Sequence, residues 1–161
     1  MDGLQIERVL HKALGKTFKG VFSFDEWKKI PRTTSPAAYV FNTLPSDQNY
    51  GHWFCVFITR HQKAIFFDSF GRSPIDLNFD GFLKRHSTSW RYSNVLLQNP
   101  FTAVCGQHVI VFLIKASKGC ITSWLKLFTN DLLSNDLLVC TLINEKFLMN
   151  TSIYPGVDFI M

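Results

Sequence analysis

Two closely spaced runs of apolar and aromatic residues constrain the fold of this chain more than any other feature. They cover residues 52–59 and 64–70, and a polar stretch over residues 60–63 separates them. Nearly continuous apolar runs of this length, bounded by polar turns, are typical of buried strands. We therefore expect an antiparallel hairpin that is buried on both faces.

Helices are expected in the part of the chain that precedes this hairpin. Residues 4–14 carry apolar side chains at helical intervals and stop at a glycine, which predicts a short amphipathic helix. Ser35-Pro36 followed by residues 37–41 resembles a helix start with proline in the first turn. Residues 18–31 are aromatic and irregular, and we expect no regular element there.

The second half of the chain is predicted to be mainly helical. The apolar run 105–116 predicts a central buried helix, and a third strand is expected over residues 94–98. This order of elements predicts the α+β class, with a small, mostly antiparallel central sheet packed by helices. The other helices are expected at residues 77–84, 122–128 and 136–148, the last capped by Ser134 or Asn135, before a turn-rich tail over residues 150–161.

Length and composition favour a single globular domain over residues 1–161. Of the 161 residues, 47% are hydrophobic and 18% are charged, so the chain can build a core and is not intrinsically disordered. The net charge of +5 favours acidic partners such as nucleic acid. Because the basic residues are scattered, this charge is only a bias towards such partners.

Targeting signals and cysteine spacing indicate the compartment. No segment approaches the ~20 consecutive apolar residues of a membrane span, and the first residues do not resemble a signal peptide. We therefore expect an intracellular protein with no membrane partner. The four cysteines lie far apart and form no CxxC pair, so we expect no disulfide framework and at most one chemically special cysteine.

Cys105 is the cysteine best placed for chemistry. It lies where a proline-containing loop meets the predicted buried helix, so free N–H groups and the helix dipole favour its thiolate. Because a helix dipole contributes typically about 0.3–1 kcal/mol, a neighbouring histidine is still needed. Cys55, Cys120 and Cys140 are interpreted as small packed hydrophobic residues.

Two histidines compete for the role of base beside this thiol. His52 opens the first strand of the hairpin next to Trp53, and His108 lies three residues after Cys105 on the predicted helix. A base at the second position points into the packed face of the helix, and we expect no neighbouring group to orient it. His52 is therefore the stronger candidate.

A carboxylate and an amide complete the set of candidate groups. Asp68 ends the second strand of the hairpin, and antiparallel pairing brings that end close to His52. Burying a carboxylate between two phenylalanines is costly without a partner, which favours a functional role. Gln98 lies seven residues before Cys105, at the end of the expected third strand, where its amide can face an oxyanion beside the Cys105 backbone N–H.

In the order of these motifs, the chain resembles the adenain family of cysteine proteases, the adenovirus endopeptidases, with relatives in other DNA viruses and virus-like elements. Gly51-His52-Trp53 resembles the catalytic His-Trp of that family, and residues 67–71 resemble its acid followed by Pro-Phe-Gly. Residues 98–106 resemble its oxyanion glutamine, loop and nucleophilic Cys-Gly, with the same spacing. The resemblance implies an adenain-like fold.

The chain departs from this family at three places. Asp68 stands where the adenovirus enzymes commonly have Glu, and Ser69 replaces the usual proline. The stretch around His86 lacks the cysteine through which those enzymes form a disulfide with an activating peptide, which argues against activation by that route. The chemistry itself requires no cofactor, and activation by DNA or by a peptide is left open.

The residues and the resemblance together predict a thiol endopeptidase. The resemblance implies cleavage after glycine in protein substrates and a role in maturing structural precursors of a virus or virus-like element. It also implies a location in the host nucleus or the virion, and it leaves viral DNA open as a partner. We expect a monomer. The predicted catalytic residues are His52, Asp68, Gln98 and Cys105, and the predicted substrate-binding residues are Gly51, Trp53 and Gly106.

Three other functions stay open at this point. Proteases that remove ubiquitin-like modifiers share the His, Asp, Gln, Cys order and cleave after glycine, so deubiquitinating or deSUMOylating activity is one alternative. A non-catalytic basic module that holds nucleic acid or a capsid protein is another. A metal site on Cys105, His108 and Cys120 is the weakest alternative, because no pair of these ligands is matched by a second pair at a spacing typical of zinc sites. We therefore predict no metal.

Overall fold

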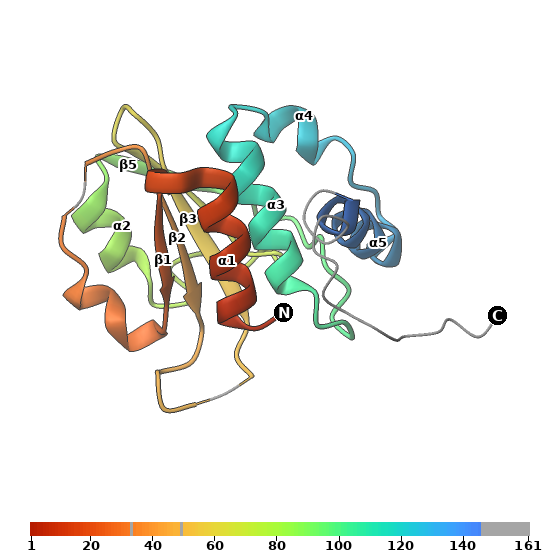
Figure 1. The fold of residues 1–161 in the computed structure, drawn as a ribbon, viewed down its shortest axis with the longest axis horizontal. Helices are drawn as coiled ribbons and strands as arrows, with labels where there is room; N and C mark the ends of the chain where they lie inside the picture. Colours follow the sequence, from red (N-terminus) through yellow and green to blue (C-terminus); the bar gives the residue numbers. More distant parts are fainter. Residues whose placement is uncertain (33, 49, 146–161) are drawn as a thin grey trace.

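A five-stranded sheet forms the centre of the protein (Figure 1). The computed structural model describes residues 1–32, 34–48 and 50–145. The strands follow one another across the sheet in chain order; the two central pairings are antiparallel, and the pairing at each edge is parallel. The strands are β1 (Phe18–Phe22), β2 (Ala37–Asn42), β3 (Trp53–Ile58), β4 (Lys63–Phe67) and β5 (Ser89–Tyr92).

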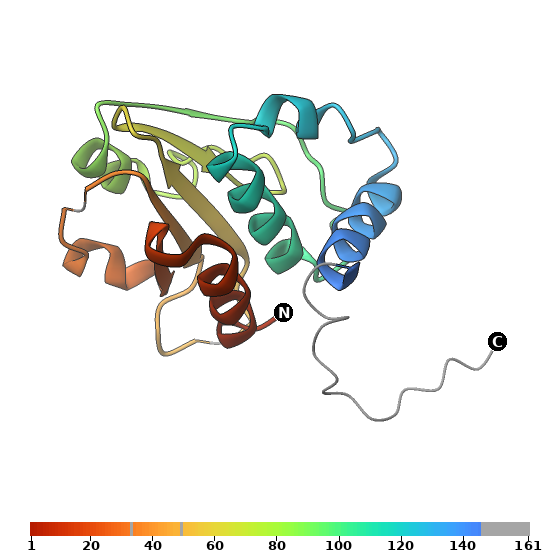
Figure 2. The ribbon, with the colours of Figure 1, turned by 45° about the horizontal axis from the view of Figure 1, so that its top comes forward.

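Helical segments cover both faces of this sheet (Figure 2). On one face lie α1 (Gly3–Leu14) and α3 (Cys105–Ser117), and on the other lie α2 (Asp80–His86) and the 3-10 segment η2 (Phe24–Lys29). Alternate residues of the central strands enter two separate cores. Because both faces are buried, the central strands β2, β3 and β4 are apolar at almost every position instead of alternating with polar residues.

The predicted hairpin is present as β3 and β4, and the α+β class is confirmed. Cys55 pairs with Phe67 and Ile58 with Ala64, so the residue before β3 lies close to the residue after β4. The predicted N-terminal helix is confirmed as α1. Its N-cap residue Asp2 forms a capping box with Gln5, in which each side chain accepts a hydrogen bond from the other residue's backbone N–H.

Three expectations for the strands are wrong. Residues 37–42 form the strand β2 and not a helix, because they pair with β1 on one side and β3 on the other. Residues 18–22, expected to be irregular, form the edge strand β1. The strand after the hairpin is β5 at Ser89–Tyr92, and residues 94–98 form no strand.

The helices of the second half follow the prediction more closely. The central buried helix is confirmed as α3 and is followed by α4 (Ile121–Leu125) and α5 (Leu132–Ile143). Helix α5 begins earlier than expected, because Asp131 caps it by accepting hydrogen bonds from two backbone N–H groups. The expected tail over residues 150–161 lies outside the described residues. Within the described part of the chain, no helix has the length and apolar character needed to cross a membrane.

Candidate active site

The structure brings His52, Asp68 and Cys105 together at one end of the central strands. His52 directly precedes β3, Asp68 directly follows β4, and Cys105 is the first residue of α3, which packs over β3. The Nε2 atom of His52 lies 3.0 Å from Oδ1 of Asp68. The thiol of Cys105 lies close enough to the His52 ring for the imidazole to lower the pKa of the thiol. The arrangement therefore aligns a thiol, an imidazole and a carboxylate.

Asp68 is fully buried, and both of its carboxylate oxygens have partners. Oδ1 contacts His52 and accepts a hydrogen bond from the backbone N–H of Phe70 at 2.7 Å. Oδ2 accepts a hydrogen bond from Nε of Arg72 at 3.0 Å, and Nη2 of Arg72 lies 2.9 Å away. The cation of Arg72 offsets the cost of burying this carboxylate.

The plane of the His52 ring is held by an aromatic contact as well. Phe70 stacks on His52 with ring centroids 4.4 Å apart and an interplanar angle of 22°. The guanidinium of Arg72 lies 5.6 Å from the centroid of the same phenylalanine ring. Phe70 and Arg72, which sequence reasoning did not single out as site residues, therefore support His52 through stacking and through Asp68.

The pKa values of Cys105 and His52 are shifted towards each other. Burial raises the pKa of the Cys105 thiol, but hydrogen bonds from His52 and from the backbone of Trp53 and Gly106 outweigh it, so this pKa is lowered. Burial lowers the pKa of His52, but the hydrogen bonds and charges of Asp68 and Cys105 outweigh it, so this pKa is raised. Both shifts favour a thiolate beside an imidazolium.

Gln98 is buried beside this group and is held at both ends of its amide. Its Oε1 atom accepts a hydrogen bond from the hydroxyl of Ser69 at 2.7 Å, and its Nε2 atom donates to the carbonyl oxygen of Thr102 at 2.8 Å. The backbone N–H groups of Leu97 and Gln98 both donate to the carbonyl oxygen of Ser69. Because a primary amide carries two N–H groups, one remains for a substrate oxygen.

The three predicted substrate-binding residues have contacts within the protein itself. A Cβ atom at Gly51 would overlap the side chain of Asn42. The indole Nε1 of Trp53 donates a hydrogen bond to the carbonyl oxygen of Met1 at 3.2 Å. A Cβ atom at Gly106 would approach the Met1 side chain to 3.0 Å. A substrate-binding role for Gly51, Trp53 and Gly106 stays a prediction.

His108, the rival base, is engaged elsewhere. Its Nε2 atom lies 2.9 Å from Oδ1 of Asp136 on α5, so the expectation that no group orients this histidine is wrong. Burial lowers the pKa of His108 and outweighs the opposing effect of Asp136. Cys120 is exposed, and its thiol donates to the carbonyl oxygen of Lys118. No group of three His, Cys, Asp or Glu side chains among the described residues could hold a metal ion.

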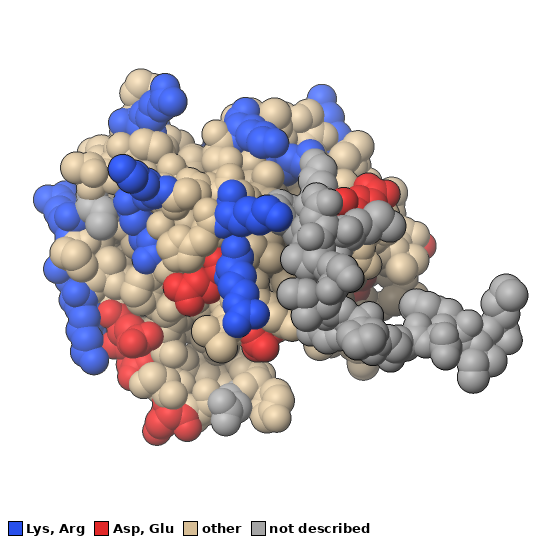
Figure 3. Space-filling view, in the orientation of Figure 1, with Lys and Arg blue, Asp and Glu red and all other residues tan. Residues whose placement is uncertain are grey.

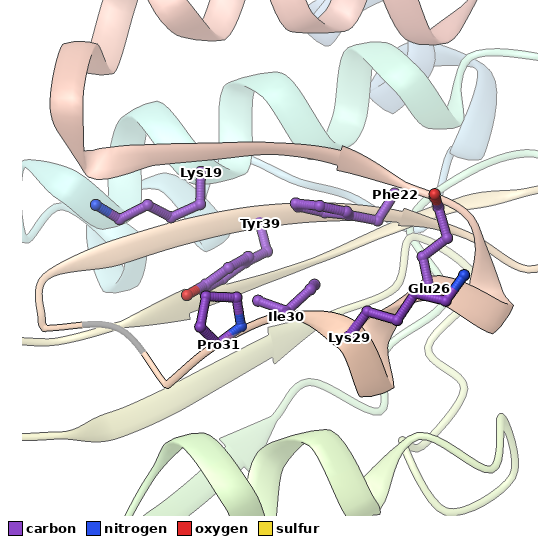
Figure 4. Close-up of a pocket in the computed structure, with 7 residues that line it drawn as sticks. All are labelled: Lys19, Phe22, Glu26, Lys29, Ile30, Pro31 and Tyr39. Carbon is purple, nitrogen blue, oxygen red and sulfur yellow. The ribbon is translucent and has the colours of Figure 1, made fainter.

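A hollow in the protein lies apart from these groups (Figure 4). It has a volume of about 280 Å³ and lies between β1, β2 and the segment around η2. Its lining contains none of the four predicted catalytic residues. The lining residues are Lys19, Phe22, Glu26, Lys29, Ile30, Pro31 and Tyr39.

The basic side chains are spread over the face seen in Figure 3. Lys and Arg side chains occur at several separate places on this face, with acidic side chains between them. This face therefore presents no single basic patch, in agreement with the scattered basic residues of the sequence.

Two solved structures have folds similar to that of this chain. The fold is similar to that of ChlaDub1 from Chlamydia trachomatis, with a TM-score of 0.51 and 15% identity, over 77% of this chain and 64% of that one. The pS273R protease of ASFV matches with a TM-score of 0.49 and 18% identity, over 72% of this chain and 57% of that one. The chain thus spans less than two thirds of each of these proteins.

The comparisons establish the fold and not the family. No protein-family model matches the chain, and no curated protein sequence matches it. The likeness to ChlaDub1 shows a shared α+β fold in which helices pack on a five-stranded sheet. Membership of the adenain family stays a prediction that rests on the motifs around His52, Asp68 and Cys105.

Proposed function

We propose that this protein is a cysteine endopeptidase that cleaves protein substrates after glycine. The observation that carries the proposal is that His52 contacts both Asp68 and Cys105. Its Nε2 atom lies 3.0 Å from the carboxylate of Asp68, and Cys105 is the first residue of α3. This is the arrangement that a thiol nucleophile, its base and an orienting acid require.

In the first half of the reaction, the Cys105 sulfur attacks the scissile carbonyl carbon, and His52 takes up the thiol proton. The carbonyl oxygen becomes an oxyanion, which the backbone N–H of Cys105 and the free N–H of Gln98 stabilise. The intermediate then collapses: the C–N bond breaks, and His52 donates its proton to the leaving amine. The product is a thioester on Cys105.

In the second half, His52 removes a proton from a water molecule that attacks the thioester. A second oxyanion forms in the same place, the C–S bond breaks, and His52 returns the proton to Cys105. Asp68 keeps the imidazole in one orientation during both halves, because its Oδ1 atom contacts Nε2 and leaves Nδ1 for the sulfur. The acid product and the free enzyme result.

Cys105 and Cys120, two of the four free cysteines, offer a matched test of this assignment. We expect Cys105→Ala to abolish cleavage of a fluorogenic peptide that ends in Gly-Gly and labelling by a Gly-Gly peptide probe that carries a C-terminal electrophile. Cys120→Ala removes an exposed free thiol and should leave both unchanged. Full cleavage or full labelling by Cys105→Ala contradicts the proposal and favours a non-catalytic module.

Removal of ubiquitin-like modifiers is the second candidate function, and the fold shared with ChlaDub1 is the observation in its favour. The two activities differ in what the site must accept: an extended chain with an internal glycine, or a folded modifier with a C-terminal one. Ubiquitin and SUMO probes with a C-terminal electrophile separate them. Rapid labelling of Cys105 by such a probe, with no cleavage of internal Gly sites, favours the isopeptidase.

The proposed biological role is maturation of structural precursors in a virus or virus-like element, in the host nucleus or the virion. The net charge of +5 is consistent with DNA as an activator. Turnover of the Gly-Gly peptide with and without duplex DNA, at low and at physiological salt, tests this part. An increase with DNA that salt abolishes supports activation, and equal rates exclude it.

A further inference from the structure

A second buried histidine and carboxylate pair lies one helical turn behind Cys105. His108 is fully buried on α3, Asp136 is 5% exposed on α5, and the two side chains meet at 2.9 Å. The mechanism above uses neither residue. A buried carboxylate is expensive unless its oxygens are satisfied, so its other partners indicate what it holds in place.

The second oxygen of Asp136 holds the loop that leads to the nucleophile. Oδ2 accepts a hydrogen bond from the hydroxyl of Thr102 at 2.7 Å and from the backbone N–H of Asn99 at 3.2 Å. Thr102 also closes this turn, because its backbone N–H donates to the carbonyl oxygen of Asn99 at 3.1 Å. One carboxylate therefore joins α3, α5 and the loop between Gln98 and Cys105.

The same loop residue holds the amide of Gln98. Its carbonyl oxygen accepts the Nε2–H of Gln98 at 2.8 Å, while Ser69 donates to Oε1 on the other side. Rotating the amide by half a turn would place Oε1 against the carbonyl oxygen of Thr102, which is repulsive. The position of Thr102 therefore decides which way the N–H groups of Gln98 point.

We propose that the His108–Asp136 pair is a positioning device for Gln98, acting through Thr102. This inference rests on the proposed function, because it assigns a role to the oxyanion donor of that reaction. His108 fixes the carboxylate, the carboxylate fixes the loop at Thr102, and the Thr102 carbonyl fixes the amide. His108 and Asp136 are positioning residues and do not touch the substrate.

Thr102→Val is the decisive variant, because it keeps the backbone carbonyl and removes only the hydroxyl that Asp136 holds. We expect kcat for the Gly-Gly peptide to fall roughly 10- to 100-fold with KM unchanged, because a displaced donor weakens only transition-state binding. Thr102→Ser, which keeps the hydroxyl, should retain most of kcat. Thr88→Val is the matched control: it deletes an exposed hydroxyl that donates to the Gln62 carbonyl oxygen.

Two further readouts separate positioning from a loss of folding. Alkylation of Cys105 by iodoacetamide forms a C–S bond and expels iodide without producing an oxyanion, so its rate should be unchanged in Thr102→Val. In the Gln98→Ala background, Thr102→Val should cause no further loss of kcat. The inference is overturned if alkylation slows as much as kcat, or if the loss persists undiminished without Gln98.

A measurement that needs no turnover tests the anchoring itself. The side-chain amide signals of Gln98 can be assigned by NMR through their loss in Gln98→Ala. We expect two separate, slowly exchanging signals in the wild type and Thr102→Ser, and faster exchange in Thr102→Val and Asp136→Asn. If the Gln98 amide protons exchange at the wild-type rate in both Thr102→Val and Asp136→Asn, the positioning role is overturned. A wild type that cleaves no Gly-Gly peptide would instead contradict the proposed function, and the amide signals would still decide this inference.

Discussion

At the scale of single residues, Asp68 and its neighbour Ser69 link the two halves of the candidate active site. The carboxylate of Asp68 contacts His52, and the hydroxyl of Ser69 contacts Gln98. Arg72 contacts the same carboxylate from the other side. The imidazole and the oxyanion donor therefore depend on two consecutive residues of one chain segment.

The charge of Asp68 can be removed with little change of shape in Asp68→Asn. Wild-type kcat/KM should rise as the Cys105 thiol, whose pKa is lowered, loses its proton, and should fall as the His52 imidazolium, whose pKa is raised, loses its own. Without the carboxylate, the pKa of His52 falls, so the alkaline limb should move to lower pH. We also expect kcat/KM to drop roughly 10- to 100-fold.

The pH profile of kcat/KM measures this effect. Asp76→Asn is the control, because this exposed carboxylate accepts a hydrogen bond only from the nearby Ser73 backbone among the contacts described for it. An alkaline limb that stays in place in Asp68→Asn would show that His52 does not depend on Asp68.

Local sequence order accounts for some of these contacts and not for others. His52 and Asp68 could be paired in advance because a short hairpin joins their strands, and antiparallel register leaves little freedom. Asp136 could not be linked to His108, because they lie 28 positions apart on α5 and α3, with α4 between them, and only the docking of α5 brings them together. Long-range contacts of this kind leave no periodic signal.

At the scale of elements, the position of Cys105 depends on how α3 docks on the sheet. Phe112 of α3 stacks on Phe67 of β4 with ring centroids 4.2 Å apart and an interplanar angle of 8°. Trp124 of α4 contacts both rings edge-on. Because Asp68 directly follows Phe67, this contact also sets the distance from the carboxylate to the start of α3.

Phe112→Ala tests the weight of this contact. We expect it to lower the free energy of unfolding by about 3–5 kcal/mol, because it removes a nearly fully buried ring and leaves a cavity. Urea denaturation followed by tryptophan fluorescence measures the change. Phe101→Ala, at a side chain that is 98% exposed, should change stability little. A cost below about 1 kcal/mol for Phe112→Ala would show that the rings contribute little to docking.

The expectation of a helix at residues 37–41, where the protein forms the strand β2, is wrong because tertiary contacts decide this element. Ser35-Pro36 before a short apolar run is compatible with a helix start, and the run is too short to show a helical or strand period. Residues 37–41 are buried on both faces and pair with two strands, and this tertiary environment decides their conformation. The β3–β4 hairpin was predictable because its turn and both strands are contiguous in the chain.

At the scale of the whole molecule, the core between the sheet and α2 contains a buried histidine that makes the stability of the protein depend on pH. His86 stacks on Phe82 at 4.2 Å, and neither ring nitrogen has a hydrogen-bond partner among the described residues. Burial and, to a smaller extent, the charges of Arg85 and Arg32 together lower the pKa of His86 to about 4. The folded protein therefore holds this ring neutral.

The consequence is a loss of stability in acid. Because the pKa of His86 is lower in the folded state than in the unfolded one, its contribution is present above about pH 6.5 and is lost as pH falls towards 4. Urea midpoints measured between these values should fall less steeply in His86→Leu than in the wild type. His11→Leu, at an exposed histidine, should keep the wild-type slope. Equal slopes in His86→Leu and the wild type would contradict this account.

The adjacency of Asp68 and Ser69 limits how the gene for this protein can tolerate insertions. An extra residue in the turn at residues 60–62 lengthens a solvent-facing connection and leaves the strand pairing intact. An extra residue between Asp68 and Ser69 moves one of them by a full step along the chain, so His52 or Gln98 loses its partner. A scan of single-codon insertions should therefore recover active clones from the turn and none from this junction.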